Sequence, residues 1–531
     1  MTLAIPALDG IAEQASIRRT FAIISHPDAG KTTLTEKFLL YAGAVAEAGA
    51  VKARAGRRRA TSDWMAMEQQ RGISITSTAL QFTYRGHVVN LLDTPGHRDF
   101  SEDTYRVLAA ADAAVMVLDM AKGIEAQTLK LFEVCRARNI PILTFLNKYD
   151  RPGRDPLELL DEIEARIDLR PTPVTWPVGF PGDFRGVIDR RTGDFMRFTR
   201  TTRGATAALE KRIDPEQAAR EEGPAWDIAV EECSLLAGVG ADVDIASFLA
   251  GETSPLFVGS ALTNFGVRHL LDAVIDMAPG PAPRVDDGGR SRHLDAPFSG
   301  FVFKVQANMD PSHRDRVAFV RVCSGRFERG MIVTHGVTGR PFSTKYAASV
   351  FASERDTIDE AYPGDIVGLV NAGGLRIGDT LYKEDPVTYP TIPTLIPELF
   401  ARARAFDTSR YKQFRSGLDQ MEQEGVVQVL RDPDGDPTPV LAAVGQMQFE
   451  VFAHRLEHEY GAAVELSPMS FKVARRTDQA TAGHLWSMSG VLILVRRDGV
   501  PLALFESDYW LQRIEADHPD WCLERILTGP R

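Results

Sequence analysis

Apolar and amphipathic stretches alternate along the first 280 residues of the chain. Apolar runs with the length of buried strands occur at Thr20–Ser25, Val88–Leu92, Ala113–Leu118 and Pro141–Leu146. Helical patterns separate these runs, for example at Thr32–Tyr41 and Ala126–Arg138. Such alternation is typical of a mostly parallel sheet with helices on both faces. We therefore predict an α/β domain over residues 1–280.

The pattern changes after Ala278–Arg290, a stretch rich in proline, glycine and aspartate. Because this composition favours turns, we place a linker at residues 281–296. Short β-rich runs divided by glycine-containing turns follow, at Phe298–Val305, Arg316–Cys323 and Ile366–Val370. These runs predict an all-β barrel domain that ends near residue 390 and, with the linker, occupies residues 281–390.

Helices and strands mix again after residue 390. One helix face is indicated by apolar residues at spacings of three and four: Phe449, Phe452, Leu456 and Tyr460. We predict an α+β domain over residues 391–531. The expected fold class is thus multidomain α/β + β, with a mostly parallel sheet covered by helices first, a β barrel second and an α+β domain last.

The charge balance limits the partners of this chain. Its 531 residues include 61 Lys and Arg and 72 Asp and Glu, for a net charge of −11, so we expect no DNA partner. Residues 51–72 are locally basic, with six positive and two acidic side chains. The four cysteines form no CxxC pair, and no apolar run has the length of a membrane span. We therefore expect a cytoplasmic protein without disulfides or a membrane contact.

The strongest chemical signal lies between the first strand and the first helix. It fits the pattern GxxxxGK[ST] with serine in place of the first glycine, over Ser25, His26, Pro27, Asp28, Ala29, Gly30, Lys31, Thr32 and Thr33. Small residues let backbone N–H groups surround phosphates, and the helix start adds its positive end. Lys31 is expected to bind the β- and γ-phosphates, and the Thr32 hydroxyl is a hard ligand for Mg²⁺.

Three further motifs each follow a predicted strand. They consist of Asp93, Thr94, Pro95, Gly96 and His97; of Asn147, Lys148, Tyr149 and Asp150; and of Ser260 and Ala261 after Gly259. Asp93 can hold Mg²⁺ through water, and the Gly96 N–H can contact a γ-phosphate. Asp150 can accept hydrogen bonds from the N1–H and 2-amino groups of guanine, which adenine lacks, and a backbone N–H at Ser260–Ala261 can reach guanine O6. Since α/β sheets bind ligands beyond the carboxyl ends of their strands, the four motifs predict a site for GTP or GDP with Mg²⁺.

These motifs resemble those of the translational GTPases. The similarity rests on the phosphate loop, on Arg71–Ile75 and on Asp93–His97. Longer runs are most similar to the bacterial class II peptide chain release factors, at Ser62–Ser77, Asn90–Arg106, Phe298–Val322 and Gly417–Arg431. The resemblance implies a ribosome-stimulated GTPase that promotes dissociation of class I release factors after peptide release and leaves after hydrolysis. Its implied partners are the bacterial ribosome and the class I factors, and we expect a monomer.

The resemblance also suggests roles for individual side chains. Ser74 stands where most translational GTPases have a threonine that ligates Mg²⁺, within a switch I segment at residues 45–77. His97 matches a histidine that turns toward the attacking water, so it is a catalytic candidate together with Lys31. Asp28 matches a residue that helps to place His97 or a monovalent cation. A turn-stabilising carboxylate is an equally good interpretation of Asp28.

Two segments have more than one interpretation. The motifs at Asn147 and Ser260 lie 113 residues apart, whereas a strand–helix–strand crossover needs only ~30 residues, so we expect an insertion at about residues 170–250. It contains a predicted hairpin at Asp183–Arg200, and it is either a ribosome or release-factor contact or a structural addition. The basic run at 51–59 is either a solvated loop or a contact with ribosomal RNA phosphate.

Other classes of protein share parts of this pattern. A ribosomal translocase has further C-terminal domains, for which residues 391–531 are too few. A class I release factor needs a Gly-Gly-Gln loop, which this sequence lacks. A nucleotide-gated binding module without hydrolysis stays as an alternative, and GTP turnover with and without ribosomes distinguishes it.

Overall fold

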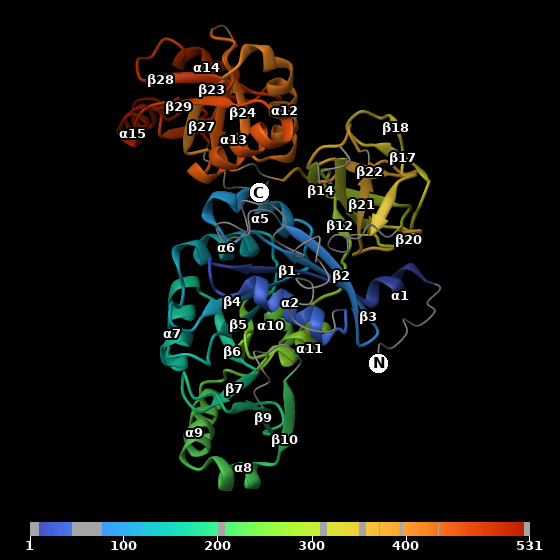
Figure 1. Ribbon diagram of the computed structural model, residues 1–531, viewed down its shortest axis with the longest axis vertical. Helices are drawn as coiled ribbons and strands as arrows, with labels where there is room; N and C mark the ends of the chain where they lie inside the picture. The colour runs from blue at the N-terminus through green and yellow to red at the C-terminus, as the bar shows by residue number, and fades with distance from the viewer. Residues whose placement is uncertain are drawn as a thin grey trace.

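The computed structural model describes residues 10–44, 77–199, 206, 208–307, 316–349, 357–370, 372–392, 395, 397–433 and 435–524. Figure 1 shows an α/β domain in the middle, a β domain in yellow beside it, and a C-terminal domain in orange and red at the top. A short helix, α1 (Ile11–Ser16), precedes the first strand. Within these described ranges, no helix is long and apolar enough to cross a membrane.

A seven-stranded sheet forms the centre of the first domain. Its order is β2-β3-β1-β4-β5-β11-β6, and its pairings are parallel except for β2 with β3. The strands are β1 (Arg18–Ser25), β2 (Thr78–Tyr84), β3 (His87–Asp93), β4 (Ala113–Asp119), β5 (Ile142–Asn147), β6 (Arg170–Pro173) and β11 (Thr253–Val258). The four predicted strands are confirmed as β1, β3, β4 and β5.

Helices cover both faces of this sheet, as predicted. Neighbouring residues of β1 point to opposite faces, so Phe21 belongs to one core cluster and Ala22 to the other. One cluster includes side chains of α2 and α11, and the other includes side chains of α5, α6 and α7. These helices are α2 (Lys31–Tyr41), α5 (Ser101–Leu108), α6 (Ala126–Ala137), α7 (Pro156–Ile167) and α11 (Val267–Met277).

A smaller unit lies between β6 and β11. Its antiparallel sheet has the order β10-β9-β8-β7, and helices α8, α9 and α10 follow it. The pairing of β8 with β9 confirms the predicted hairpin. In Figure 1 this unit lies at the end of the molecule opposite to the C-terminal domain. Its elements are β7 (Thr175–Val178), β8 (Gly186–Asp189), β9 (Phe195–Thr199), β10 (Leu209–Ile213), α8 (Pro215–Glu222), α9 (Pro224–Gly238) and α10 (Ile245–Leu249).

The β domain consists of a seven-stranded antiparallel sheet with the order β18-β17-β22-β14-β15-β21-β19. Two short pairs accompany it, β12 with β13 and β16 with β20. The strands are β12 (Arg284–Val285), β13 (Ser291–Arg292), β14 (Ser299–Ala307), β15 (Arg316–Ser324), β16 (Phe327–Glu328), β17 (Ile332–His335), β18 (Pro341–Ser343), β19 (Ala347–Ser349), β20 (Glu360–Ala361), β21 (Ile366–Val370) and β22 (Thr380–Tyr382). The pair β12–β13 falls inside the predicted linker.

The C-terminal domain is α+β, as predicted. Its antiparallel sheet has the order β26-β23-β25-β24-β28-β29-β27, and the predicted helix around Phe449 is α13. The segment after Thr477 supplies β28 and β29, so it completes the sheet rather than forming a separate tail. The elements are β23 (Leu399–Ala405), η3 (Thr408–Arg410), α12 (Tyr411–Glu424), β24 (Gln428–Arg431), β25 (Val440–Ala443), α13 (Gln446–Tyr460), β26 (Val464–Pro468), β27 (Val473–Arg476), α14 (Gln479–Leu485), β28 (Val491–Arg496), β29 (Pro501–Phe505) and α15 (Asp508–Asp517).

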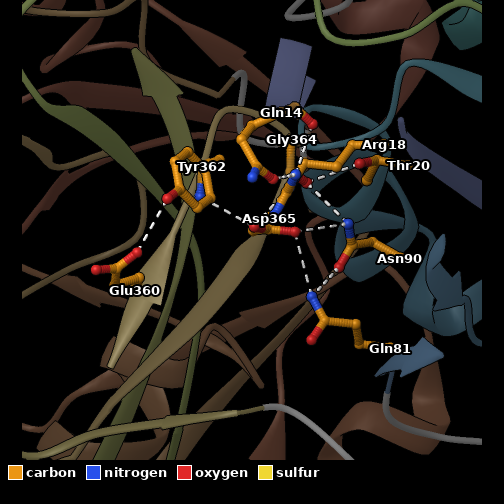
Figure 2. A network of polar contacts seen from close by, with 9 residues as sticks. All are labelled: Gln14, Arg18, Thr20, Gln81, Asn90, Glu360, Tyr362, Gly364 and Asp365. Carbon is orange, nitrogen blue, oxygen red and sulfur yellow. Dashed lines mark hydrogen bonds and ion pairs between the residues drawn. The ribbon is translucent and has the colours of Figure 1, made fainter. Parts of the chain in front are cut away.

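A buried polar network joins the β domain to the first domain (Figure 2). At its centre, the Asp365 carboxylate accepts hydrogen bonds from Arg18 Nε at 2.7 Å, Gln81 Nε2 at 3.2 Å and Asn90 Nδ2 at 3.4 Å. Thr20 Oγ1 donates to the neighbouring Gly364 carbonyl at 2.7 Å. These contacts hold strands β1, β2 and β3 against the β domain.

Candidate functional site

The predicted phosphate loop connects β1 to α2. Gly30 precedes α2 with φ of 99°, a left-handed conformation that glycine adopts without strain. A Cβ at Gly30 would also overlap the side-chain amide of Asn147. Asp28 is exposed and has φ of 65°, so it sits in a tight turn, and its two interpretations both remain predictions.

Asn147 connects three of the four motifs. Its Nδ2 donates to the carbonyl of Ala29 at 2.7 Å. Its Oδ1 accepts the N–H of Lys148 at 2.9 Å and the N–H of Ala261 at 2.8 Å. The carboxyl ends of β1, β5 and β11 therefore meet at one place. Since the Ala261 N–H is engaged by Asn147, its contact with guanine O6 stays a prediction.

Lys31 and Asp93 form a buried ion pair. Lys31 Nζ lies 2.9 Å from Asp93 Oδ1, and both side chains are less than a tenth exposed. The pair brings the phosphate loop next to the carboxyl end of β3. Thr94 fixes the following turn, because its hydroxyl donates to the carbonyl of Ile23 at 2.7 Å. Each buried charge is thus compensated by the other.

Asp150 offers an unused acceptor at the edge of the site. Its Oδ1 is buried and has no hydrogen-bond partner among the described residues, and its side chain is 11% exposed. A buried carboxylate oxygen without a donor is costly, so the position fits a ligand that brings N–H groups. This is the chemistry that the guanine N1–H and 2-amino groups supply.

Lys148 is held beside Asp150 by a partner that the motifs did not reveal. Its Nζ lies 2.8 Å from Asp119 Oδ2, at the end of β4. Burial alone would raise the pKa of Asp119, but the hydrogen bonds from Lys148 and from the Ala121 N–H, together with the nearby positive charge of Lys148, outweigh burial and the pKa is lowered. Lys148 itself has φ of 71°. Asp119 follows a buried strand as Asp93 does, which is the signal that could have identified it.

His97 lies on the turn after β3, just before the short helix η1 (Arg98–Phe100). Its side chain is 31% exposed. The N–H of Asp99 donates to His97 Nδ1 at 3.2 Å, and Asp99 Oδ1 lies 3.4 Å from the same nitrogen. The imidazole packs edge-on against Phe100 at 6.3 Å between ring centres. Two contacts thus hold the ring on its own turn.

Two further side chains support the loops of the site and were missed from the sequence. Gln127 Nε2 donates to the carbonyl of Gly96 at 2.9 Å, which fixes the turn before His97. Glu125 lies 2.7 Å from His26 Nδ1. Burial lowers the pKa of His26, although Glu125 opposes this shift. Gln127 lies in α6 and Glu125 just before it, and no motif in the sequence marks them.

Part of the predicted switch I lies outside the described residues. This applies to Ser74, to the RGISI run and to the basic residues 51–59. The described chain resumes at Ser77, whose N–H donates to Asp103 Oδ2 at 2.9 Å. Lys304 of the β domain donates to the Ser77 carbonyl and, at 2.9 Å, to its hydroxyl. The end of this segment is therefore bound to both α5 and the β domain.

Three protein families match consecutive parts of the chain. Residues 16–280 match the elongation factor Tu GTP binding domain. Residues 297–384 match elongation factor G domain 2, and residues 389–515 match the C-terminal domain of class II release factor RF3. The first match agrees with the site described above and supports binding of GTP and GDP.

Curated relatives match nearly the whole chain. Proteins named peptide chain release factor 3 from Synechocystis sp. (strain PCC 6803) and Synechococcus elongatus (strain PCC 7942) are 49% and 50% identical over 534 and 527 residues. These alignments cover 99% and 97% of this chain, and 97% and 94% of the relatives. A crystal structure of a protein from Thermus thermophilus shares the fold, with a TM-score of 0.69 and 22% identity, over 91% of this chain and 72% of that one. The chain belongs to the peptide chain release factor 3 family of translational GTPases.

Proposed function

We propose that this protein hydrolyses GTP on the ribosome during termination of protein synthesis and thereby recycles class I release factors. It binds after the nascent peptide has been released, promotes departure of the class I factor, and leaves once GTP is cleaved. Family membership over nearly the full length supports this function. The single structural observation that supports GTP as the nucleotide is the buried Oδ1 of Asp150. This oxygen has no hydrogen-bond partner among the described residues and can accept the N–H groups of guanine.

The Lys31–Asp93 pair supplies a site for the phosphates. When the nucleotide enters, the ammonium group of Lys31 turns from Asp93 to the β- and γ-phosphate oxygens. Asp93 and the hydroxyls of Thr32 and, outside the described residues, Ser74 would hold Mg²⁺ beside these phosphates. Bound Mg²⁺ would neutralise charge on the phosphate oxygens. The ion pair thus keeps both groups beside the phosphate loop.

His97 is the residue that acts on the attacking water. Because its Nδ1 accepts the N–H of Asp99, the neutral ring carries its proton on Nε2. A ring in this tautomer can donate from Nε2 to the oxygen of a water and hold it in line with the γ-phosphate. Lys31 stabilises the charge on the phosphate oxygens, and Asp28 helps to place the ring.

The partners follow from the same function. They are the bacterial ribosome and the class I release factors that occupy its decoding site. We propose that the protein acts as a monomer in the cytoplasm. The basic residues at 51–59 would contact ribosomal RNA phosphate. The negative net charge of the protein does not prevent this contact, because the positive charge is local.

Asp150→Asn tests the function through its nucleotide. An asparagine amide loses one acceptor for guanine but can donate to the 2-oxo group of xanthine. We expect GTP affinity to fall by about 100-fold. Release of a bound class I factor from ribosomes after peptide release should then require xanthosine triphosphate.

The matched control is Asp168→Asn, on a carboxylate that is 87% exposed. This variant should keep full GTP-dependent release. Equal release by Asp150→Asn with GTP, or none with xanthosine triphosphate, would contradict the assignment of Asp150. Release without any nucleotide turnover would favour a binding module that does not hydrolyse GTP.

A further inference from the structure

The helix pair α12–α13 of the C-terminal domain packs on the segment that follows His97. At the first contact, the Asp99 carboxylate accepts the N–H of Met447 at 2.8 Å. Met447 lies in the first turn of α13, where backbone N–H groups have no partner within the helix. Asp99 therefore caps a helix that lies far along the chain, in another domain.

The glycine before this helix is required for the contact. Gly445 has φ of −149°, an extended conformation that any residue adopts, so its backbone does not require glycine. A Cβ at Gly445 would instead overlap the carboxylate of Asp99. The absence of a side chain at this position is what allows Asp99 to reach α13.

The second contact places a positive side chain, Arg106, at the C-terminal end of α12. Arg106 of α5 donates through Nη1 to the carbonyls of Glu424 and Gly425 at 3.4 and 3.3 Å, where α12 ends. Arg106 also pairs with Glu102 at 2.5 Å. An anion thus lies at the start of α13 and a cation at the end of α12, as the helix dipoles favour.

The same Asp99 contacts His97. Oδ2 accepts the helix N–H, Oδ1 lies 3.4 Å from His97 Nδ1, and the Asp99 N–H donates to that nitrogen. One residue therefore contacts both the catalytic candidate and the C-terminal domain. No motif marks Asp99, because its partner lies in another domain.

We infer that Asp99 is a positioning residue that ties His97 to the docking of the C-terminal domain. While the domain is docked, Asp99 holds η1 and the imidazole on their own turn. When α13 leaves, the turn is released and His97 can rotate toward the attacking water. The inference rests on the proposed role of His97 and adds the element that controls it.

Gly445→Ala tests this coupling without changing any side chain of the site. Amide hydrogen exchange at Met447 should increase, because the cap is lost. Single-turnover cleavage of GTP without ribosomes should become about fivefold faster, while GTP affinity stays unchanged. Asp99→Ala should behave alike, and Asp99→Asn should restore the parental rate, because asparagine caps helices as well as aspartate does.

The matched control is Gln423→Ala, which removes a contact of α12 with Arg316 of the β domain instead of a contact with the segment after His97. It should leave the cleavage rate unchanged. An unchanged rate in both Gly445→Ala and Asp99→Ala would overturn the inference, as would unchanged exchange at Met447 in Asp99→Ala.

His97→Ala separates the two proposals: if it has no effect on ribosome-stimulated turnover, the role of His97 fails. If it abolishes that turnover but the Gly445 and Asp99 variants change nothing, the coupling alone fails.

Discussion

The β domain and the C-terminal domain both pack on the first domain, but they contact it at different places. The β domain binds at the start of β1, where Arg18 pairs with Asp365 and both side chains are less than a tenth exposed, and it also reaches Ser77 through Lys304. A second, partly buried pair joins Arg321 to Asp112, just before β4. The C-terminal domain binds beyond the end of β3, through Asp99 and Arg106.

The two interfaces therefore have different expected roles: the network around Asp365 stabilises the fold, and the contact at Asp99 affects the rate of GTP cleavage. Arg18 and Ser25 lie at opposite ends of an eight-residue strand, about 23 Å apart, so a change at Asp365 is remote from the phosphate loop. Asp99 instead lies two residues from His97 and contacts its ring. We therefore expect damage to the first interface to lower the free energy of unfolding. Damage to the second should change the rate of GTP cleavage.

The largest effect is expected from Asp365→Ala. The substitution leaves the guanidinium of Arg18 buried beside the β domain without its carboxylate. The free energy of unfolding should fall by about 3–5 kcal/mol, as measured by denaturant titration. Asp359→Ala is the control, because its carboxylate is 74% exposed and pairs at the surface with Arg329. A loss as small as that of the control would show that the interface is not a source of stability.

The next largest effect is expected from His97→Ala, which removes the side chain that Asp99 contacts at the second interface. Ribosome-stimulated kcat should fall by about 10²–10³-fold, because the proposed mechanism assigns to His97 the orientation of the water and the stabilisation of charge. GTP affinity should not change, since no phosphate contact is lost. Rapid-quench measurement of GTP cleavage on ribosomes decides this. Full turnover by the variant would remove His97 from the mechanism.

Arg321→Lys is a milder change at the β-domain interface. Arg321 Nη2 lies 2.7 Å from both oxygens of Asp112, and the guanidinium also donates to the carbonyl of Ala110. Lysine keeps the charge but cannot span these acceptors. The free energy of unfolding should fall by about 1–2 kcal/mol, with no change in the cleavage rate. A change in rate would mean that this interface also affects the site.

The smallest effect is the pH dependence contributed by His269, which lies at neither interface. Burial lowers the pKa of His269 below its usual value of about 6.5, although Asp189 and Asp272 oppose this shift. The unfolded chain then binds more protons, so stability is complete above pH 6.5 and is lost as the pH falls toward the lowered pKa. The slope contributed is at most about 1.4 kcal/mol per pH unit. His269→Gln should reduce it in unfolding curves recorded from about pH 7 to pH 5, and an unchanged slope would contradict the shift.

The sequence predicted features that depend on local pattern. Strand-length runs placed Ser25, Asp93 and Asp150 near the carboxyl ends of strands, and the structure has them there. Parallel pairing brings these strand ends together independently of loop conformation, so the motifs were sufficient to predict the site. The role of Ser74 stays a prediction, because it lies outside the described residues.

Contacts between domains could not be predicted in this way. In the sequence, Gly445 is an ordinary residue before a helix, and Asp99 is an acid after a turn. Their roles depend on how the two domains pack, and the spacing of apolar residues along the chain does not predict that packing. The same holds for Asn147, whose amide joins three loops once the strands are aligned.

The most direct test of this difference is single-turnover GTP cleavage, without ribosomes, by Gly445→Ala and Asp365→Ala side by side. The account predicts faster cleavage by the Gly445 variant and an unchanged rate constant for the Asp365 variant, despite the lower stability of the latter. Equal rate constants for Gly445→Ala and the parent protein, or acceleration in both variants, would contradict it.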